Sequence, residues 1–196
     1  MPRIVDHAER RNAIARAARR AIAQSGLDGV TMRSIAAAGG VTTGAVTHYF
    51  ANKDEILSAT LEVITNDTLE RLRSRTTSSI EGFLDLLELA MPTSDERRDE
   101  WRAWLAFWAR GSSDGHPLSD DDRRIRTEWL ALLEEKVRHL EETGAATLAD
   151  TPAVIGYRIS HIVNGIALEA CLDPARWPAD RQSDELAAMV TPMLTP

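Results

Sequence analysis

Apolar side chains recur along the chain at the three- and four-residue spacing of helices, and no segment shows the alternating pattern of a strand. Clusters of Gly, Pro, Ser and Asp separate the helical segments. Residues 112–117 are such a cluster, and we expect an irregular loop there. The predicted fold class is therefore all-α. Helices are predicted over residues 6–25, 32–39, 43–50, 53–75, 80–91, 95–111, 120–142, 152–172 and 181–193.

The most informative segment is 32–53, where two short helices are predicted on either side of a glycine pair. Ile35 lies on the apolar face of the first helix, and Thr31 stands where a side chain can cap its first turn. Gly39 and Gly40 permit the backbone conformation in which a helix ends and the chain turns. This order of elements predicts a helix-turn-helix.

The second short helix presents small polar side chains. Val46 and Phe50 are four residues apart and form its buried face, and either Thr42 or Thr43 can cap it. Short donors and acceptors on a narrow helix suit the DNA major groove. On this pattern alone, a helical hairpin that never binds nucleic acid remains an alternative. The side chains left to face outward are Thr43, Gly44, Thr47, His48 and Tyr49.

The charge of the chain is unevenly distributed. The 196 residues carry a net charge of −7. Residues 1–60 contain eight Lys/Arg and five Asp/Glu, a net charge of +3, whereas the remainder contains 15 and 25, a net charge of −10. The basic share thus lies with the predicted helix-turn-helix, where contacts with phosphate would need it, and the acidic remainder would repel DNA.

The composition indicates the cellular compartment and argues against a catalytic or metal site. The sequence has no apolar run long enough for a membrane span or a signal peptide, and the single Cys171 cannot form an internal disulfide, so we expect a cytoplasmic protein. Cys171 has no histidine at helical spacing to activate it, and Glu135 and His139 lack a third metal ligand. We therefore expect no enzyme activity, cofactor or metal.

A stripe of indoles marks a candidate ligand site. Trp101, Trp104 and Trp108 are spaced so that they share one face of a helix. Such a stripe is typical of a plain core, but indole faces also attract quaternary ammonium groups and flat apolar ligands. Further candidates on the neighbouring helices are Phe83, Trp129, His161 and Asn164.

The N-terminal stretch resembles the tetracycline-repressor (TetR) family of bacterial regulators. The resemblance covers about the first 57 residues without a gap, and there are two departures: Gly39 stands where the family usually has alanine, and Thr47 where it usually has a phosphate-contacting tyrosine. The residues that carry it are Arg11, Ala17, Ala18, Gly26, Thr31, Ile35, Ala36, Gly40, Val41, Gly44, Tyr49, Phe50 and Lys53.

A second, weaker resemblance points to the BetI-like subgroup of this family. It rests on the string Thr-Gly-Ala-Val-Thr-His-Tyr-Phe at 43–50, on Trp-Leu-Ala-Phe-Trp at 104–108, and on the segment 164–174. The resemblance makes choline one candidate effector among many.

The family resemblance implies an organisation. It implies a helix-turn-helix DNA-binding domain at 1–52, a ligand-binding and dimerisation domain at 53–196, and a homodimer whose last two helices form the interface. The wide apolar stripe over 152–172 agrees with such an interface, although a monomer that buries this helix centrally would show the same stripe.

We therefore expect a small-molecule-responsive transcriptional regulator that acts as a repressor and leaves its operator when an effector binds. The alternative is a helical small-molecule-binding protein without specific DNA binding. Thr43 and His48 are placed for base edges, and Gly44 for close approach to the groove wall. The remaining expected DNA contacts, mainly to phosphates, are Arg33, Thr42, Thr47, Tyr49 and Lys53.

Overall fold

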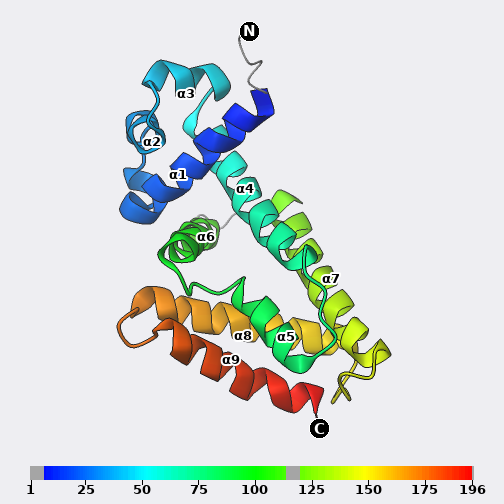
Figure 1. Ribbon diagram of the computed structural model, residues 1–196. Helices are drawn as coiled ribbons and strands as arrows, with labels where there is room; N and C mark the ends of the chain where they lie inside the picture. The colour runs from blue at the N-terminus through cyan, green and yellow to red at the C-terminus, as the bar shows by residue number, and fades with distance from the viewer. Residues whose placement is uncertain (1–6, 114–119, 196) are drawn as a thin grey trace. The chain divides into compact units, whose positions relative to one another are not determined.

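The computed structural model describes residues 7–113 and 120–195, and all regular secondary structure in these ranges is helical (Figure 1). The all-α prediction is confirmed. None of the helices described is long and apolar enough to cross a membrane. The helices are α1 (His7–Gly29), α2 (Met32–Gly39), α3 (Thr43–Tyr49), α4 (Lys53–Arg73), α5 (Ile80–Glu88), α6 (Asp95–Ser113), α7 (Asp120–Glu142), α8 (Pro152–Leu172) and α9 (Ala179–Leu194).

Most helix boundaries lie within a few residues of those predicted. Helix α5 is an exception, because it ends at Glu88 rather than Met91. The amides of Leu89, Ala90 and Met91 each donate to the carbonyl three residues earlier, so tight turns replace the last helical turn. Helix α6 continues two residues into the predicted 112–117 loop, and the rest of that loop lies outside the described residues.

The chain divides into two compact units, and α4 and α6 contribute to both. The first unit comprises the chain up to Asp67 and the part of α6 that begins at Arg102. Its core packs α1 against α2, α3 and the start of α4. The side chains buried there include Ile14, Ile22, Ile35, Val46, Phe50, Ile56 and Ile64.

Helix α1 does not end at Gly26, where the sequence predicted its end. Gly26 has a φ of 68°, a left-handed conformation that interrupts the helix, and the chain then makes one more turn to Gly29. This extra turn buries Leu27 in the first unit. The glycine therefore redirects the chain without stopping it.

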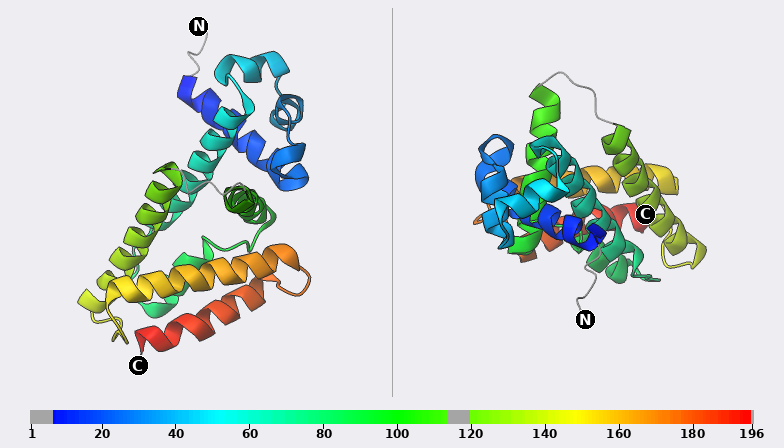
Figure 2. Two further views of the ribbon diagram at one scale, coloured as in Figure 1. Left: turned by 180° about the vertical axis from the view of Figure 1, so that it is seen from behind. Right: turned by 90° about the horizontal axis from the view of Figure 1, so that it is seen from above.

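The second unit comprises Thr68–Trp101 and helices α7, α8 and α9. Helix α8 packs against both α7 and α9, and two views show α8 and α9 side by side (Figure 2). At Gly156 a Cβ would lie 3.0 Å from the backbone nitrogen of Glu134, so this glycine lets α8 approach the α7 backbone closely. The core residues on these helices include Leu132, Leu133, Val137, Ile155, Ile159, Val163, Leu186 and Val190.

Two polar contacts hold the C-terminal end of α4 in the second unit. Arg71 forms an ion pair with Glu100 of α6 at 2.7 Å, and the Glu100 side chain is only 5% exposed. Lys136 of α7, also buried, donates to the carbonyl of Arg75 at 2.9 Å, just beyond the end of α4. Each cation therefore has a specific acceptor, which lowers the cost of removing its charge from water.

Candidate nucleic-acid interface

The first helix of the predicted helix-turn-helix begins with a reciprocal cap. The Thr31 hydroxyl accepts a hydrogen bond from the Ser34 amide at 3.1 Å, and the Ser34 hydroxyl accepts one from the Thr31 amide at 2.9 Å. Two amides that the first turn leaves unpaired are thereby satisfied. The predicted cap at Thr31 is confirmed.

The turn between α2 and α3 depends on Gly40. Its φ of 62° places it in the left-handed region, and its amide donates back to the carbonyls of Ala36 and Ala37. Val41 follows, half-buried against the core of the first unit. Together these residues set the direction in which α3 leaves the turn.

Helix α3 is held by its apolar face and leaves its polar face outward. The Thr42 hydroxyl accepts from the Ala45 amide at 3.1 Å, so Thr42 is the cap. Val46 and Phe50 are buried in the core of the first unit, as predicted from their spacing. The exposed residues of this segment are Thr42, Thr43, Gly44, Thr47 and His48.

Two of these exposed positions have distinct local geometry. A Cβ at Gly44 would meet nothing closer than the Thr42 hydroxyl oxygen, 3.9 Å away, so this part of the helix surface is open. The Thr47 hydroxyl donates to the Gly44 carbonyl at 3.2 Å. Its proton is therefore used within the helix, while its oxygen remains free to accept.

Three rings gather at the end of α3. The Tyr49 ring, half-buried, lies with its centroid 5.1 Å from that of His48 and 4.6 Å from that of His7. His7 is the first residue of α1, and its ring centroid is 6.4 Å from that of His48. The start of α1 is thus part of the same surface as the end of α3.

Arg11 joins three helices beneath that surface. One guanidinium nitrogen is 3.4 Å from the Tyr49 carbonyl at the end of α3, and another forms an ion pair at 3.1 Å with Glu55 in the first turn of α4. The same Glu55 accepts from the Ala51 amide at 2.8 Å, just before the start of α4. The Asn52 side chain caps α4 by accepting a hydrogen bond from the Glu55 amide at 2.9 Å.

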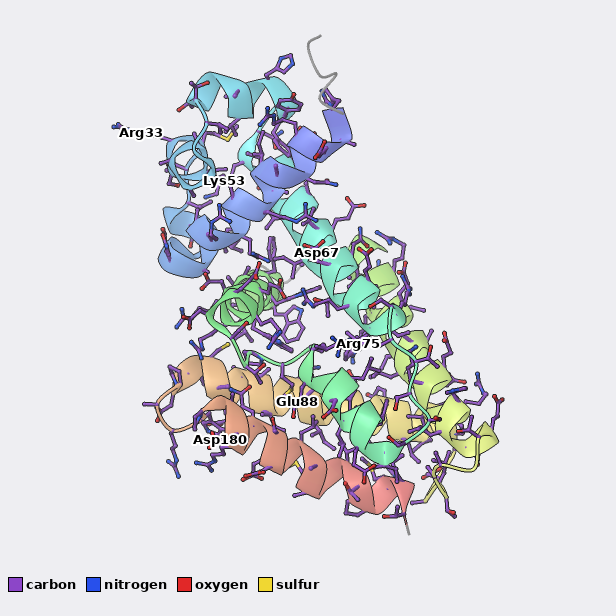
Figure 3. The ribbon with its side chains drawn as sticks, viewed as in Figure 1. Arg33, Lys53, Asp67, Arg75, Glu88 and Asp180 are labelled. Atoms are coloured by element: carbon purple, nitrogen blue, oxygen red, sulfur yellow. The ribbon has the colours of Figure 1, made fainter. Side chains whose placement is uncertain are left out.

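The two cations predicted to contact DNA are placed differently. The Arg33 side chain on α2 is exposed and extends away from the ribbon (Figure 3). Lys53, the first residue of α4, is half-buried, and its ammonium lies 3.5 Å from the Asp28 carbonyl. That weak contact leaves donors of the ammonium available to a phosphate.

The candidate ligand residues of the second unit are tied into its packing. Phe83 is fully buried in the core. The indole N–H of Trp101 donates to the Ala90 carbonyl at 2.7 Å, and that of Trp129 donates to the Ser160 hydroxyl at 2.9 Å. These bonds satisfy the polar end of each indole and orient its ring.

The tryptophans of α6, predicted to share one face, do not all pack into the same core. Trp101 packs against the core of the second unit, whereas Trp104 packs against that of the first. The ring centroids of Trp104 and Trp108 are 5.8 Å apart. His161 is exposed on α8, and Asn164 is half-buried.

Two family models match this architecture. The model for bacterial regulatory proteins of the tetR family matches residues 14–60, which contain the helix-turn-helix. The model for the C-terminal domain of BetI-type transcriptional repressors matches residues 79–195. The chain belongs to the TetR family of bacterial transcriptional regulators. Proteins of this family bind operator DNA, dimerise and respond to small molecules.

Named relatives agree with the family assignment. The chain is 30% identical over 186 residues to the regulator PksA of Bacillus subtilis, covering 92% of this chain and 88% of PksA. It is 29% identical over 179 residues to the regulator BetI of Escherichia coli, covering 88% of this chain and 87% of BetI. The predicted resemblance to TetR regulators of the BetI type is confirmed.

Solved structures share the fold. A TetR-family regulator from Rhodococcus sp. superposes with a TM-score of 0.79 at 20% identity, over 95% of this chain and 99% of that one. A regulator from Saccharomonospora viridis, crystallised in complex with choline, superposes with a TM-score of 0.73 at 21% identity, over 94% and 96% of the two chains. At these identities the similarity establishes the fold.

The sequence did not predict that His7 and Arg11 would lie at the candidate interface. Arg11 had a signal, since it belongs to the family pattern, but its three partners come from segments distant in sequence. His7 had none, because its contacts with His48 and Tyr49 depend on how α1 and α3 pack.

Proposed function

We propose that the protein is a homodimeric repressor whose two α3 helices bind operator half-sites and whose second unit binds the effector. The observation that carries this proposal is the division of α3 into two faces. Val46 and Phe50 anchor the helix, and its polar face, which begins at Thr42, lies open to solvent. A recognition helix needs such a face to enter the major groove.

The contact roles follow from placement along α3. Thr43 and His48 are exposed, and their polar side chains are small enough to fit in the major groove, so we assign them to contacts with base edges. Thr42 at the cap, Tyr49 at the end of α3 and Lys53 beyond it are assigned to phosphates. Arg33 on α2 joins the phosphate set because its cation is exposed. The Thr47 hydroxyl oxygen is assigned as an acceptor for a hydrogen bond from the DNA.

The dimer interface is assigned to α8 and α9. Among the described residues, most large apolar side chains that remain exposed lie on these two helices. On α8 they share one side of the helix, because Tyr157 and Leu168 are about three helical turns apart and the other two lie within a turn of these. An exposed apolar stripe of this kind indicates an interface, and a second copy would bury it symmetrically. The exposed apolar residues are Val154, Tyr157, Leu168 and Leu172 on α8 and Met189 on α9.

The effector is assigned to the second unit, with a small cation as the first candidate. The BetI-type model spans this unit, and the Saccharomonospora relative was crystallised with choline. Indole faces such as those of Trp101 and Trp129 attract a quaternary ammonium. Effector binding would act through α4, which runs from Lys53 in the first unit to Arg73 in the second. It would shift the population of dimers away from the conformation in which both first units bind the operator. This regulatory function involves no catalytic step.

The proposal is tested by titrating labelled duplex DNA from the region upstream of the protein's own gene, at several salt concentrations. Sequence-specific binding with a steep salt dependence, weakened by saturating effector, is the expected result. Weak binding that is equal for a scrambled duplex would instead support a small-molecule-binding protein without specific DNA recognition. Unchanged operator affinity despite tight effector binding would contradict the coupling through α4.

A further inference from the structure

His7 extends the surface of the recognition helix onto α1. Its ring lies 4.6 Å from Tyr49, a proposed phosphate contact, and 6.4 Å from His48, a proposed base contact. Both histidines are exposed, so the contact leaves ring edges open to a ligand. Phosphates of the DNA backbone flank the groove that a recognition helix enters. A side chain against Tyr49 is therefore in a position to meet one of them.

We propose that His7 is a further DNA-contacting residue, which binds a backbone phosphate beside the groove and adds a proton-dependent charge to the interface. This inference rests on the proposed role of α3 as the recognition helix. A protonated imidazole has two N–H donors and one positive charge, which suits a phosphate oxygen. A neutral imidazole offers one donor and no charge, so protonation strengthens the contact.

Charged groups of both signs lie near the three rings. Arg11 also contacts Tyr49, but its guanidinium is paired with Glu55 and bonded to the Tyr49 carbonyl. Glu9 and Arg10 in the first turn of α1 are exposed and of opposite sign. The charged and titratable groups at the start of α1, at the end of α3 and in the first turn of α4 are His7, Glu9, Arg10, Arg11, His48, Tyr49, Lys53, Asp54 and Glu55.

The consequence is that operator binding takes up protons. Imidazole side chains change charge between about pH 5 and 8, and a phosphate alongside favours the charged form. Affinity should therefore rise as pH falls from 8 to 6. The dependence on salt should steepen as well. The slope of log K against log salt should change by about 0.9 for each phosphate contact, and so by about 1.8 for a dimer with one His7 in each chain.

The test compares wild-type protein with His7→Phe and His7→Gln. The probe is a labelled duplex that the wild-type protein selects from a random-sequence pool, with a scrambled duplex beside it. The phenylalanine keeps a flat ring against Tyr49 but has no charge. For both variants we expect the slope difference between pH 6 and pH 8 to shrink by about 1.8, and affinity at pH 6 to fall about tenfold. At pH 8 His7→Phe should bind within about threefold of wild type, because the neutral imidazole there contributes at most one uncharged hydrogen bond.

Several outcomes separate this role from others. His139→Gln on α7 of the second unit is the matched control and should behave as wild type. If His7→Phe keeps the wild-type slope change, His7 does not contact phosphate. If it weakens binding equally at both pH values, His7 only positions Tyr49, and the proposal is also wrong. If the wild-type protein enriches no sequence from the pool, the proposed function itself fails, independently of any His7 variant.

Discussion

The guanidinium carbon of Arg11 lies 4.3 Å from the centroid of the Phe50 ring. Phe50 is the residue that ends α3, and it is buried. The same guanidinium contacts the Tyr49 carbonyl and Glu55, so one side chain of α1 fixes where α3 ends and where α4 begins. The orientation of the recognition helix therefore depends on a residue that need not touch DNA.

Replacing Arg11 by alanine should weaken both stability and DNA binding. Loss of the cation–π contact and of a partly exposed ion pair should lower the free energy of unfolding by about 1–2 kcal/mol. Operator affinity should fall several-fold, because the end of α3 loses its support. Urea unfolding and DNA titration measure the two effects.

Arg16 provides the matched control on the same helix. It pairs with Asp67 of α4 at 2.7 Å. Arg16→Ala should therefore lower stability slightly and leave operator affinity unchanged. Equal losses of affinity in both variants would mean that Arg11 has no specific positioning role.

The Arg71–Glu100 pair should be the most sensitive ion pair of the second unit. Glu100→Gln leaves the Arg71 guanidinium without its counter-charge. Because the Arg71 side chain is 30% exposed, we expect a loss of about 2 kcal/mol, below the roughly 3–5 kcal/mol typical of a fully buried pair. The Asp95–Arg98 pair of α6 has a carboxylate that is 98% exposed, and Asp95→Asn should change stability by less than about 0.5 kcal/mol. Urea unfolding of both variants checks the difference.

A double replacement sharpens that prediction. Arg71→Met combined with Glu100→Leu removes both charges and should recover most of the stability lost in Glu100→Gln, because two apolar side chains carry no desolvation cost. If the double variant is as unstable as the single one, packing around Glu100 rather than its charge is the cause.

The parts of this molecule that the sequence predicted are those that local rules decide. Helix α7 has the predicted bounds of Asp120 and Glu142, since amphipathic spacing and a following glycine are local signals. Thr31 and Gly40 were predicted for the same reason, because a cap and a left-handed turn each need one particular residue type.

The parts that escaped prediction depend on contacts between distant segments. The indoles of α6 share a spacing, but spacing does not tell which core each ring joins, and Trp101 and Trp104 belong to different units. The continuation of α1 past Gly26 is another case. It is favoured by burial of Leu27, which becomes visible only when the surrounding helices are in place.

Gly44→Ala should separate stability from DNA binding. A Cβ at this position meets open space, and alanine favours a helix by up to about 1 kcal/mol over glycine, so the variant should be at least as stable as wild type. Operator affinity should nevertheless fall about tenfold or more, because the added methyl group keeps α3 from the groove wall. DNA titration and thermal unfolding check both statements.

Gly40→Ala is the contrasting variant. The φ of 62° at this position strains any residue with a Cβ and should cost about 1–2 kcal/mol of stability. Its loss of DNA binding should therefore follow its loss of folded protein. Full operator affinity in Gly44→Ala would show that α3 does not approach the groove as closely as proposed.

Lys53 and Thr43 should affect DNA binding in different ways. Lys53→Ala removes a phosphate contact, so it should weaken all operators alike and reduce the salt slope by about 0.9 per head. Thr43→Val should instead change which base is preferred, with the salt slope unchanged. Selection from random duplexes and salt titration distinguish the two. Altered sequence preference with an unchanged slope in Lys53→Ala would mean that the assigned roles are reversed.

Leu168→Arg should dissociate the dimer. Leu168 is 41% exposed on the apolar stripe of α8, so an arginine there disturbs little within one chain but buries a charge against a second copy. Sedimentation equilibrium should show monomers, and operator affinity should fall by about 100-fold or more because the second head no longer binds intramolecularly. Ala131→Arg, at an exposed position on α7, should remain dimeric and bind normally. A dimeric Leu168→Arg protein with full operator affinity would move the interface away from α8.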